Sequence, residues 1–392
     1  MLTSIVILPM LLRMRMLFVT GALSLLLMAC GAGDDVVAER SGGFEVATQV
    51  GVSPLLHIDR KYKSMEGPSA LTTFTLQPGP PEILWITAYR TEVVDTDGRS
   101  EDSLREFMCH NNLNFDAEVH RERFGLTRFV NFGRMFTASQ GALEIVFPEG
   151  FGIPVLSDEP LEVQTMVLNH NREDADLSVR HRITVEFMRD ADAPGRLRPL
   201  YPVATPGMAL LQGPNGYYGL SKEPSHEQAG SSCAVGIVAP NAPKGTKYWT
   251  DPQGRVFTQH WVVPPGREVR HTLITRIMNL PFDTTLHFIN AHLHPFAESV
   301  ELRDLTTDET LFRAAAHPPD HGIGLAHIES FASPTGIPVY LDHEYEIVSV
   351  YENPTGVDQD AMAVLYLYFY DAETDTRLES MRRDLASVSQ GT

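Results

Sequence analysis

The feature that most constrains the fold of this chain is a series of short apolar runs separated by Pro- and Gly-rich turns. Many of the runs alternate apolar and polar residues with period two, the pattern of a strand with one buried face. The runs are Leu71–Gln77, Ile83–Val94, Leu143–Phe147, Leu161–Leu168, Leu177–Met188, Val256–Val263, Glu268–Met278, Thr285–His294, Val339–Leu341, Glu344–Tyr351 and Met362–Tyr370. Short helices are expected only at Ser103–Met108 and Arg377–Val388. The sequence therefore predicts an all-β protein.

A length of 392 residues and one change in composition predict two tandem antiparallel β-sandwich domains. The segment from Arg189 to Lys247 is dense in Pro, Gly, Ser and Ala, which indicates a linker or an insertion. The expected parts are an N-terminal sandwich over 45–215, a linker or insertion over 216–250, a C-terminal sandwich over 251–375 and a tail over 376–392.

The first 29 residues have the composition of a secretory signal peptide. They contain no acidic residue, and Arg13 and Arg15 precede the apolar run Leu17–Met28. This run is shorter than the ~20 residues that span a bilayer as a helix. Cys30 follows the small residue Ala29, as in a bacterial lipobox. We expect residues 1–29 to be removed and Cys30 to be lipidated.

The residues after the expected cleavage site predict a location in the bacterial cell envelope. Residues 30–44 read as a lipidated tether, and membrane contact is expected only through the lipid on Cys30. Gly31 stands where an Asp would indicate retention in the inner membrane, so we expect the periplasmic side of the outer membrane. Met14 and Met16 are alternative starts, and an uncleaved anchor remains the alternative reading.

Charge and motif content exclude several classes of function. The chain has 31 Lys and Arg against 50 Asp and Glu, a formal charge of −19, which argues against a nucleic-acid partner. Three Cys are too few for a disulfide-stapled scaffold. The sequence has no Gly-x-Ser-x-Gly elbow, HExxH motif, Walker loop or dinucleotide fingerprint. A glycosidase stays open, because its paired carboxylates cannot be singled out among 50 acids.

The triplet His292-Leu293-His294 is a candidate metal site. Residues i and i+2 of a strand share one face, so both imidazoles point the same way. Met362 begins a later strand, and a thioether beside two imidazoles favours copper, especially Cu(I). The alternative is two ordinary histidines and a methionine that fills a gap in the core.

The C-terminal half resembles the copper type II, ascorbate-dependent monooxygenases, the family of peptidylglycine α-hydroxylating monooxygenase and dopamine β-monooxygenase. The matching features, in order, are the Pro264-Pro265-Gly266 turn, the pair His292 and His294, and Met362. The resemblance covers about residues 251–372 and is weak over 45–215. It implies two jelly-roll-like sandwiches with one copper in each, the catalytic copper held by His292, His294 and Met362.

The resemblance places an electron-donating copper in the N-terminal half, at His110 and His170. Asn111 stands where the family has a second adjacent His, and an amide is a poor Cu(I) ligand. The donor copper is therefore either present, which gives two copper ions per chain, or lost, which gives one. Cys109 could supply a thiolate, or pair with Cys233 in an oxidising compartment.

The activity implied by the resemblance is hydroxylation of an unactivated C–H bond of a small substrate, with O2 and a small reductant such as ascorbate. Tyr366 would line the substrate pocket, although it also reads as an aromatic core residue. Asn290 stands where the peptide-processing relative has an Arg, and Val364 replaces an Asn, so a glycine-extended peptide is not the expected substrate. The alternative function is a non-catalytic copper-binding or surface-interaction lipoprotein, which Asn111 favours.

The remaining histidines are not expected to take part in the metal site. His317, His321 and His327 are expected in a solvated loop, with an accessory site as the alternative. The sequence assigns no role to His260 and His271 and places His57 and His120 on the surface.

Overall fold

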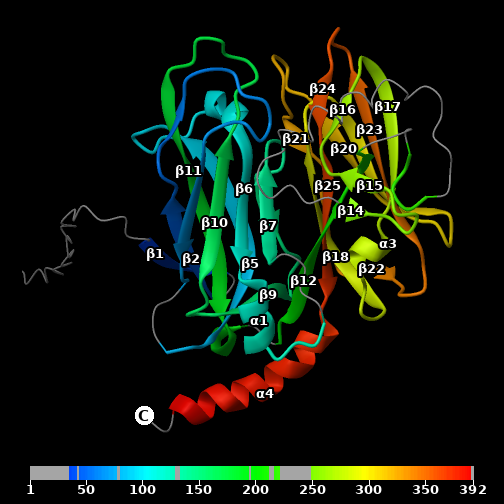
Figure 1. The fold of residues 1–392 in the computed structure, drawn as a ribbon. Coiled ribbons are helices and arrows are strands. Elements are labelled where there is room, and N and C mark those ends of the chain that lie inside the picture. Colours follow the sequence, from blue (N-terminus) through cyan, green and yellow to red (C-terminus); the bar gives the residue numbers. More distant parts are fainter. Residues whose placement is uncertain are drawn as a thin grey trace, which may run out of the picture. The chain divides into compact units, whose positions relative to one another are not determined.

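The chain is an all-β protein built from antiparallel sandwiches, as the sequence predicts (Figure 1). This computed structural model describes residues 35–41, 44–76, 80–128, 133–193, 196–211, 216–220 and 249–389. The expected signal peptide, Cys30, Cys233 and most of the expected linker lie outside these residues. Asp34–Thr392 forms one compact unit.

The N-terminal half is a sandwich of two sheets. One sheet contains β1 (Asp35–Ser41), β2 (Phe44–Val52), β11 (Leu177–Arg189), β5 (Ile83–Val94) and β9 (Phe151–Leu156), with β3 (Leu56–Ile58) and β8 (Glu144–Val146) at its sides. The other has the order β4 (Ser69–Phe74), β10 (Leu161–Val167), β6 (Met108–Phe115) and β7 (Arg134–Ser139). Apolar side chains from both sheets, including Leu84, Leu113 and Phe136, form the core between them.

The C-terminal half repeats this arrangement. The first sheet of the N-terminal half continues into it, because β12 (Arg198–Pro206) pairs in parallel with β9, and the order goes on through β25 (Ala363–Tyr370), β18 (Thr284–Leu293) and β22 (Phe331–Val339). The facing sheet has the order β17 (Gly266–Leu273), β23 (Tyr345–Asn353), β19 (Ala297–Asp304), β20 (Glu309–His317) and β21 (His327–Ile328). Two small sheets lie beside them: β13 (Ala209–Leu210), β15 (Val256–Thr258) and β14 (Trp249–Thr250), and the pair β16 (Trp261–Val263) and β24 (Gln359–Ala361).

Strand β25 belongs to two cores at once. Its residues Leu365 and Leu367 pack in the C-terminal core, whereas Tyr366 and Tyr368 pack in the N-terminal core. This explains why the strand is apolar at every position rather than at alternate ones. Figure 1 shows β7 of the N-terminal half beside β25 and β18. Strand β12, inside the expected N-terminal range, pairs with β25 along seven residues, and the domain boundaries stay a prediction.

In the described part of the chain, helices are few and short apart from the last one. They are η1 (Asp102–Phe107), α1 (Ala117–Arg123), η2 (Asp190–Asp192), α3 (Thr275–Met278) and α4 (Ala372–Ser389). The two helices predicted from sequence correspond to η1 and α4. Leu378 of α4 packs with Trp85, and Arg382 pairs with Asp190, so the C-terminal helix is tied to the N-terminal sandwich. Among the described residues, no helix combines the length and apolar character needed to cross a bilayer.

Several local predictions were wrong. The strand expected over Glu268–Met278 ends at Leu273, and α3 follows because Asn279 adopts the left-handed conformation that closes a helical turn. The strand expected over Val339–Leu341 ends with β22 at Val339. His317 and His327 face each other on β20 and β21 rather than lying in a loop. His120 is buried, where it contacts the Glu159 carboxylate, instead of lying on the surface.

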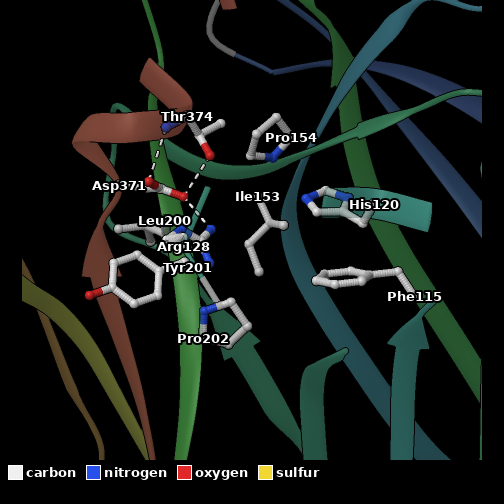
Figure 2. Close-up of a pocket in the computed structure, with 10 residues that line it drawn as sticks. All are labelled: Phe115, His120, Arg128, Ile153, Pro154, Leu200, Tyr201, Pro202, Asp371 and Thr374. Carbon is white, nitrogen blue, oxygen red and sulfur yellow. Dashed lines mark hydrogen bonds and ion pairs between the residues drawn. The ribbon is translucent and has the colours of Figure 1, made fainter. Parts of the chain in front are cut away.

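A buried ion pair joins the N-terminal half to the start of α4. The Arg128 guanidinium contacts the Asp371 carboxylate, which also accepts hydrogen bonds from Thr374 (Figure 2). The two charged side chains are only 8% and 2% exposed. Removing one partner of such a pair leaves an uncompensated charge in a site with little water.

We therefore expect Asp371→Ala to lower the free energy of unfolding by about 3–5 kcal/mol. Urea denaturation followed by circular dichroism measures this change. Asp358→Ala, at an exposed position of the same half, is the control and should shift stability by no more than ~0.5 kcal/mol. Equal stability of the two variants would contradict a stabilising role for the pair.

Candidate metal centre

The register of β18 against β25 places the predicted ligands on one face. His292 lies opposite Val364, and Leu293 lies opposite Ala363. One step further, the His294 backbone N–H donates to the Met362 carbonyl at 3.1 Å. Because opposite residues of an antiparallel pair project from the same face, the side chains of His292, His294 and Met362 share the face of Val364. That face packs against the N-terminal half.

His110 of β6 meets this face from the N-terminal half. Its ring centre lies 6.2 Å from that of His292, and the His292 and His294 ring centres are 5.4 Å apart. Imidazoles bound to one metal at about 2.0–2.1 Å have ring centres roughly 4.5–6.4 Å apart, depending on the bond angle. His110, predicted for the donor copper, therefore lies beside His292 and His294, predicted for the catalytic copper. We call these three histidines and the residues that contact them the cluster.

The cluster contains two residues that sequence reasoning missed. The ring centre of His260 lies 5.9 Å from that of His294, and Oδ2 of Asp360 lies 3.0 Å from Nδ1 of His294. The short strands β16 and β24 bring both residues there, because Val262 pairs with Asp360. The only sequence signal was the position of Asp360, two residues before Met362 and thus on the same side of an extended chain.

Burial lowers the pKa of His110, His260 and His292. Burial, with Arg134 and other histidines nearby, lowers the pKa of His110 to about 3. Burial lowers the pKa of His260 to about 4 and holds the pKa of His292 well below its usual range. Burial alone would raise the pKa of Asp360, but His294, His170 and His260 together lower it to about 2. Neutral imidazoles beside a carboxylate are the protonation states that metal binding requires.

Several ring nitrogens of the cluster have no hydrogen-bond partner. They are Nε2 of His170, Nε2 of His260, Nδ1 of His292 and Nδ1 of His294, all buried. The contact of His294 with Asp360 has ion-pair distance but lacks hydrogen-bond alignment. A buried polar atom without a partner costs ~1–3 kcal/mol, so these nitrogens favour a bound ligand.

His170 lies on a loop that its neighbours hold in place. The Asn169 side chain donates to backbone carbonyls of Arg60 and Arg172, at 2.9 and 2.7 Å. The Asn171 side chain bonds both backbone polar groups of Ile323, which belongs to the C-terminal half. Burial lowers the pKa of His170, opposed by the Asp360 charge, so both residues lie in one electrostatic environment.

Asn111 does not face the cluster. Its side-chain oxygen accepts from the Tyr89 hydroxyl, and its nitrogen lies 3.1 Å from Nδ1 of His181. Both ends of the amide are therefore occupied inside the N-terminal sandwich. Cys109 is a buried free thiol whose pKa burial raises to about 12, so it does not supply a thiolate at neutral pH. Its suggested partner Cys233 lies outside the described residues.

The residues of the cluster fit copper in kind. Imidazoles and a thioether are ligands that copper accepts in both oxidation states. Within the described part of the chain, no three His, Cys, Asp or Glu side chains already converge in the arrangement of a metal site. The ring spacings of His110 with His292, His292 with His294 and His260 with His294 are those of pairs only. Met362 and Asp360 are half-buried, whereas His292 and His294 are buried, so the cluster reaches solvent on one side.

The predicted substrate residues lie in packed surroundings. Tyr366 is 5% exposed and belongs to the N-terminal core, opposite Asn290. Asn290 donates to the Thr137 carbonyl at 2.8 Å and thereby links the two halves. Arg134 on β7 is half-buried, and its positive charge helps to lower the pKa of His292. The role of Tyr366 at a substrate stays a prediction.

A pocket elsewhere in the molecule contains no residue of the cluster (Figure 2). It is lined by Phe115, His120, Arg128, Ile153, Pro154, Leu200, Tyr201, Pro202, Asp371 and Thr374. It leaves room for about one water molecule. The Arg128–Asp371 ion pair lies at its wall, and this volume is too small for an organic substrate, so we assign it a structural role.

Comparisons with known proteins yield a likeness of structure alone. No family model and no curated protein matches this sequence. The major capsid protein P2 of bacteriophage PM2 is similar over 81% of this chain and 97% of that chain, with 8% identity and a TM-score of 0.28. A peptide-N(4)-(N-acetyl-β-D-glucosaminyl) asparagine amidase is similar over 80% of this chain and 96% of that chain, with 9% identity and a TM-score of 0.28. These scores carry no argument about function, and neither name describes a copper monooxygenase.

Buried His181 makes the stability of the metal-free protein depend on pH. Burial lowers the pKa of His181 to about 3, whereas an unfolded His has a pKa of about 6.5. Between these values the unfolded chain binds a proton that the folded chain does not, so stability falls as the pH drops below ~6.5. One such group contributes about 1.4 kcal/mol per pH unit.

We therefore expect His181→Leu to flatten the decline of unfolding free energy between pH 6.5 and pH 4. Urea denaturation in the presence of a chelator at several pH values measures the slope. His57→Leu replaces an exposed histidine of β3 and should keep the slope of the unmodified protein. If both variants have the same slope, His181 does not contribute to it.

Proposed function

We propose that this chain is a copper-dependent monooxygenase of the bacterial cell envelope, similar to the ascorbate-dependent family. The observation that carries the proposal is a row of buried histidines, His110, His292 and His294, where β6 faces the end of β18. The ring centres of His110 and His292, and of His292 and His294, lie 6.2 and 5.4 Å apart. Buried nitrogens without partners support a ligand at this place.

Each residue of the centre has a defined task in this proposal. His292 and His294 would hold copper through buried imidazoles, with Met362 as the soft third ligand, and His110 and His170 would hold or assist the electron-donating copper. Copper bound there would supply one-electron redox chemistry and activation of O2. The chain's own contribution is to fix His110 on β6 and His292 on β18, and to lower the pKa of both by burial.

The overall reaction balances with a two-electron reductant. A substrate C–H bond is converted to C–OH, one oxygen atom of O2 enters the product, and the other leaves as water. Two electrons and two protons come from a reductant such as ascorbate. The site residues do not identify the substrate beyond a small molecule with an unactivated C–H bond, because Asn290 is engaged with Thr137 and cannot pair with a carboxylate.

A second candidate function is copper binding without catalysis. The specific observation in its favour is Asn111, whose amide is bonded to Tyr89 and adjacent to His181 instead of facing His110. The donor site then has at most two histidines, which weakens electron supply. A copper-storing or surface-interaction lipoprotein would need only to bind copper and would not need to transfer electrons or activate O2.

The proposed location follows from the N-terminal sequence. Residues 1–29 would be removed as a signal peptide, and Cys30 would carry the lipid that holds the protein on the periplasmic side of the outer membrane. This setting supplies O2 and small reductants to the site, and the acidic surface argues against a nucleic-acid partner.

Copper content distinguishes the role of the predicted ligands. We expect the purified protein to bind one or two copper ions, and His292→Ala to lose at least one of them, because a buried imidazole is removed from the centre of the row. Elemental analysis after dialysis measures the stoichiometry. His57→Ala, at an exposed position of β3, should bind as much copper as the unmodified protein.

Oxygen incorporation separates the enzyme from the binding protein. With ascorbate, copper and 18O2, a monooxygenase places one labelled oxygen atom in a hydroxylated product, which mass spectrometry detects in a panel of small apolar compounds. A loaded protein that gives no labelled product across the panel favours the binding function. A protein that binds no copper would refute both functions.

A further inference from the structure

We infer that His260 and Asp360 belong to the metal centre, His260 as a ligand beside His292 and His294, and Asp360 as the group that orients His294. This inference rests on the proposed function only in requiring that the cluster binds a metal. It changes the expected ligand set from two imidazoles and a thioether to three imidazoles, with Met362 at the rim.

The position of His260 is set by a small two-stranded sheet at the open side of the cluster. Trp261 pairs with Ala361 and Val262 pairs with Asp360, so the antiparallel register continues to His260 opposite Met362. The ring centre of His260 lies 5.9 Å from that of His294. This spacing falls within the roughly 4.5–6.4 Å expected for two imidazoles on one metal ion.

The hydrogen bonding of His260 leaves one role open. Its Nε2 is buried and has no hydrogen-bond partner. Nδ1 of His292 also has no hydrogen-bond partner, and the His292 residue is 6% exposed. Histidines with a purely structural role elsewhere in the chain are paired: His120 contacts Glu159 at 2.8 Å and His343 contacts Asp304 at 2.6 Å. Nε2 of His181 also lacks a partner, but His181 lies in the N-terminal sandwich beside Asn111, whereas the unpartnered nitrogens of His260 and His292 lie in one group of neighbouring imidazoles, where a bound ion would satisfy them together.

Asp360 lies where an orienting carboxylate is needed. Its Oδ2 is 3.0 Å from Nδ1 of His294. A carboxylate on one ring nitrogen fixes the tautomer, turns the other nitrogen to the metal and makes it a better ligand. A small rotation of the ring would align this contact, leaving Nε2 of His294 for the ion. The negative charge also offsets part of the charge of a bound cation.

The test is copper and cobalt binding by the full chain, with competition against a chelator and with spectroscopy. We expect His260→Ala to weaken Cu(II) binding at least 10-fold and to reduce by one the number of nitrogen ligands in the electron paramagnetic resonance spectrum. We expect Asp360→Asn to weaken binding 10- to 100-fold and to shift the Co(II) absorption bands without loss of a nitrogen ligand. Thermal unfolding of the metal-free variants shows whether each has folded.

Matched controls separate these effects from general damage. His271→Ala removes a half-buried histidine of β17, and Asp358→Asn removes the same charge two residues from Asp360. Both should bind copper as the unmodified protein does. If His260→Ala fails to fold, His260→Gln replaces it and should show the same loss.

The outcomes distinguish this inference from the proposed function. Copper binding by the unmodified protein that depends on His292 but is unchanged in both His260→Ala and Asp360→Asn overturns the inference and leaves the proposed function standing. Absence of copper binding by the unmodified protein overturns both. Loss of affinity in His260→Ala with an unchanged nitrogen count also rejects His260 as a ligand.

Discussion

The arrangement of this protein depends on one strand that is buried on both faces. Leu365 and Leu367 of β25 fill the C-terminal core, and Tyr366 and Tyr368 fill the N-terminal core. Because side chains alternate along a strand, a shift of one residue would exchange the two sets, and neither core would pack. The register of β18 against β25 is therefore fixed. The same register directs His292 at the N-terminal half, so the position of the candidate centre follows from the packing of the cores.

Sequence reasoning could predict the parts that depend on local periodicity. The strand with His292 and His294 and the apolar strand after Met362 both follow from short-range patterns, and their pairing puts all three side chains on one face. Strand β6, which carries His110, was missed because half of its residues are polar and its apolar residues do not alternate with them. Its polar side chains are buried but bonded, as where Asn112 accepts from Thr137 at 2.8 Å. Periodicity of hydrophobic residues cannot detect a strand of this kind.

Long-range pairing explains the remaining omissions. His260 reaches the cluster only because β16 pairs with β24, whose residues are about a hundred positions away in the sequence. The interpretation of Asn111 depends on contacts of the same kind, since Tyr89 and His181 are 22 and 70 residues away. The sequence could show that an amide replaces a histidine. It could not show that the amide contacts two buried polar groups of the N-terminal sandwich, the Tyr89 hydroxyl and the His181 imidazole.

The energetics of the cluster argue for a ligand rather than for a structural role. Each buried nitrogen without a partner costs ~1–3 kcal/mol, and His170, His260 and His292 each have one, whereas Nδ1 of His294 has the Asp360 carboxylate at 3.0 Å. A domain has only ~5–15 kcal/mol of net stability, so several such costs in one place are a large fraction of it. Apolar residues of similar volume would stabilise the interface between the halves better. In the proposed function a bound metal ion would offset these costs, and its ligands would then link β6, β18 and the residue that precedes β16.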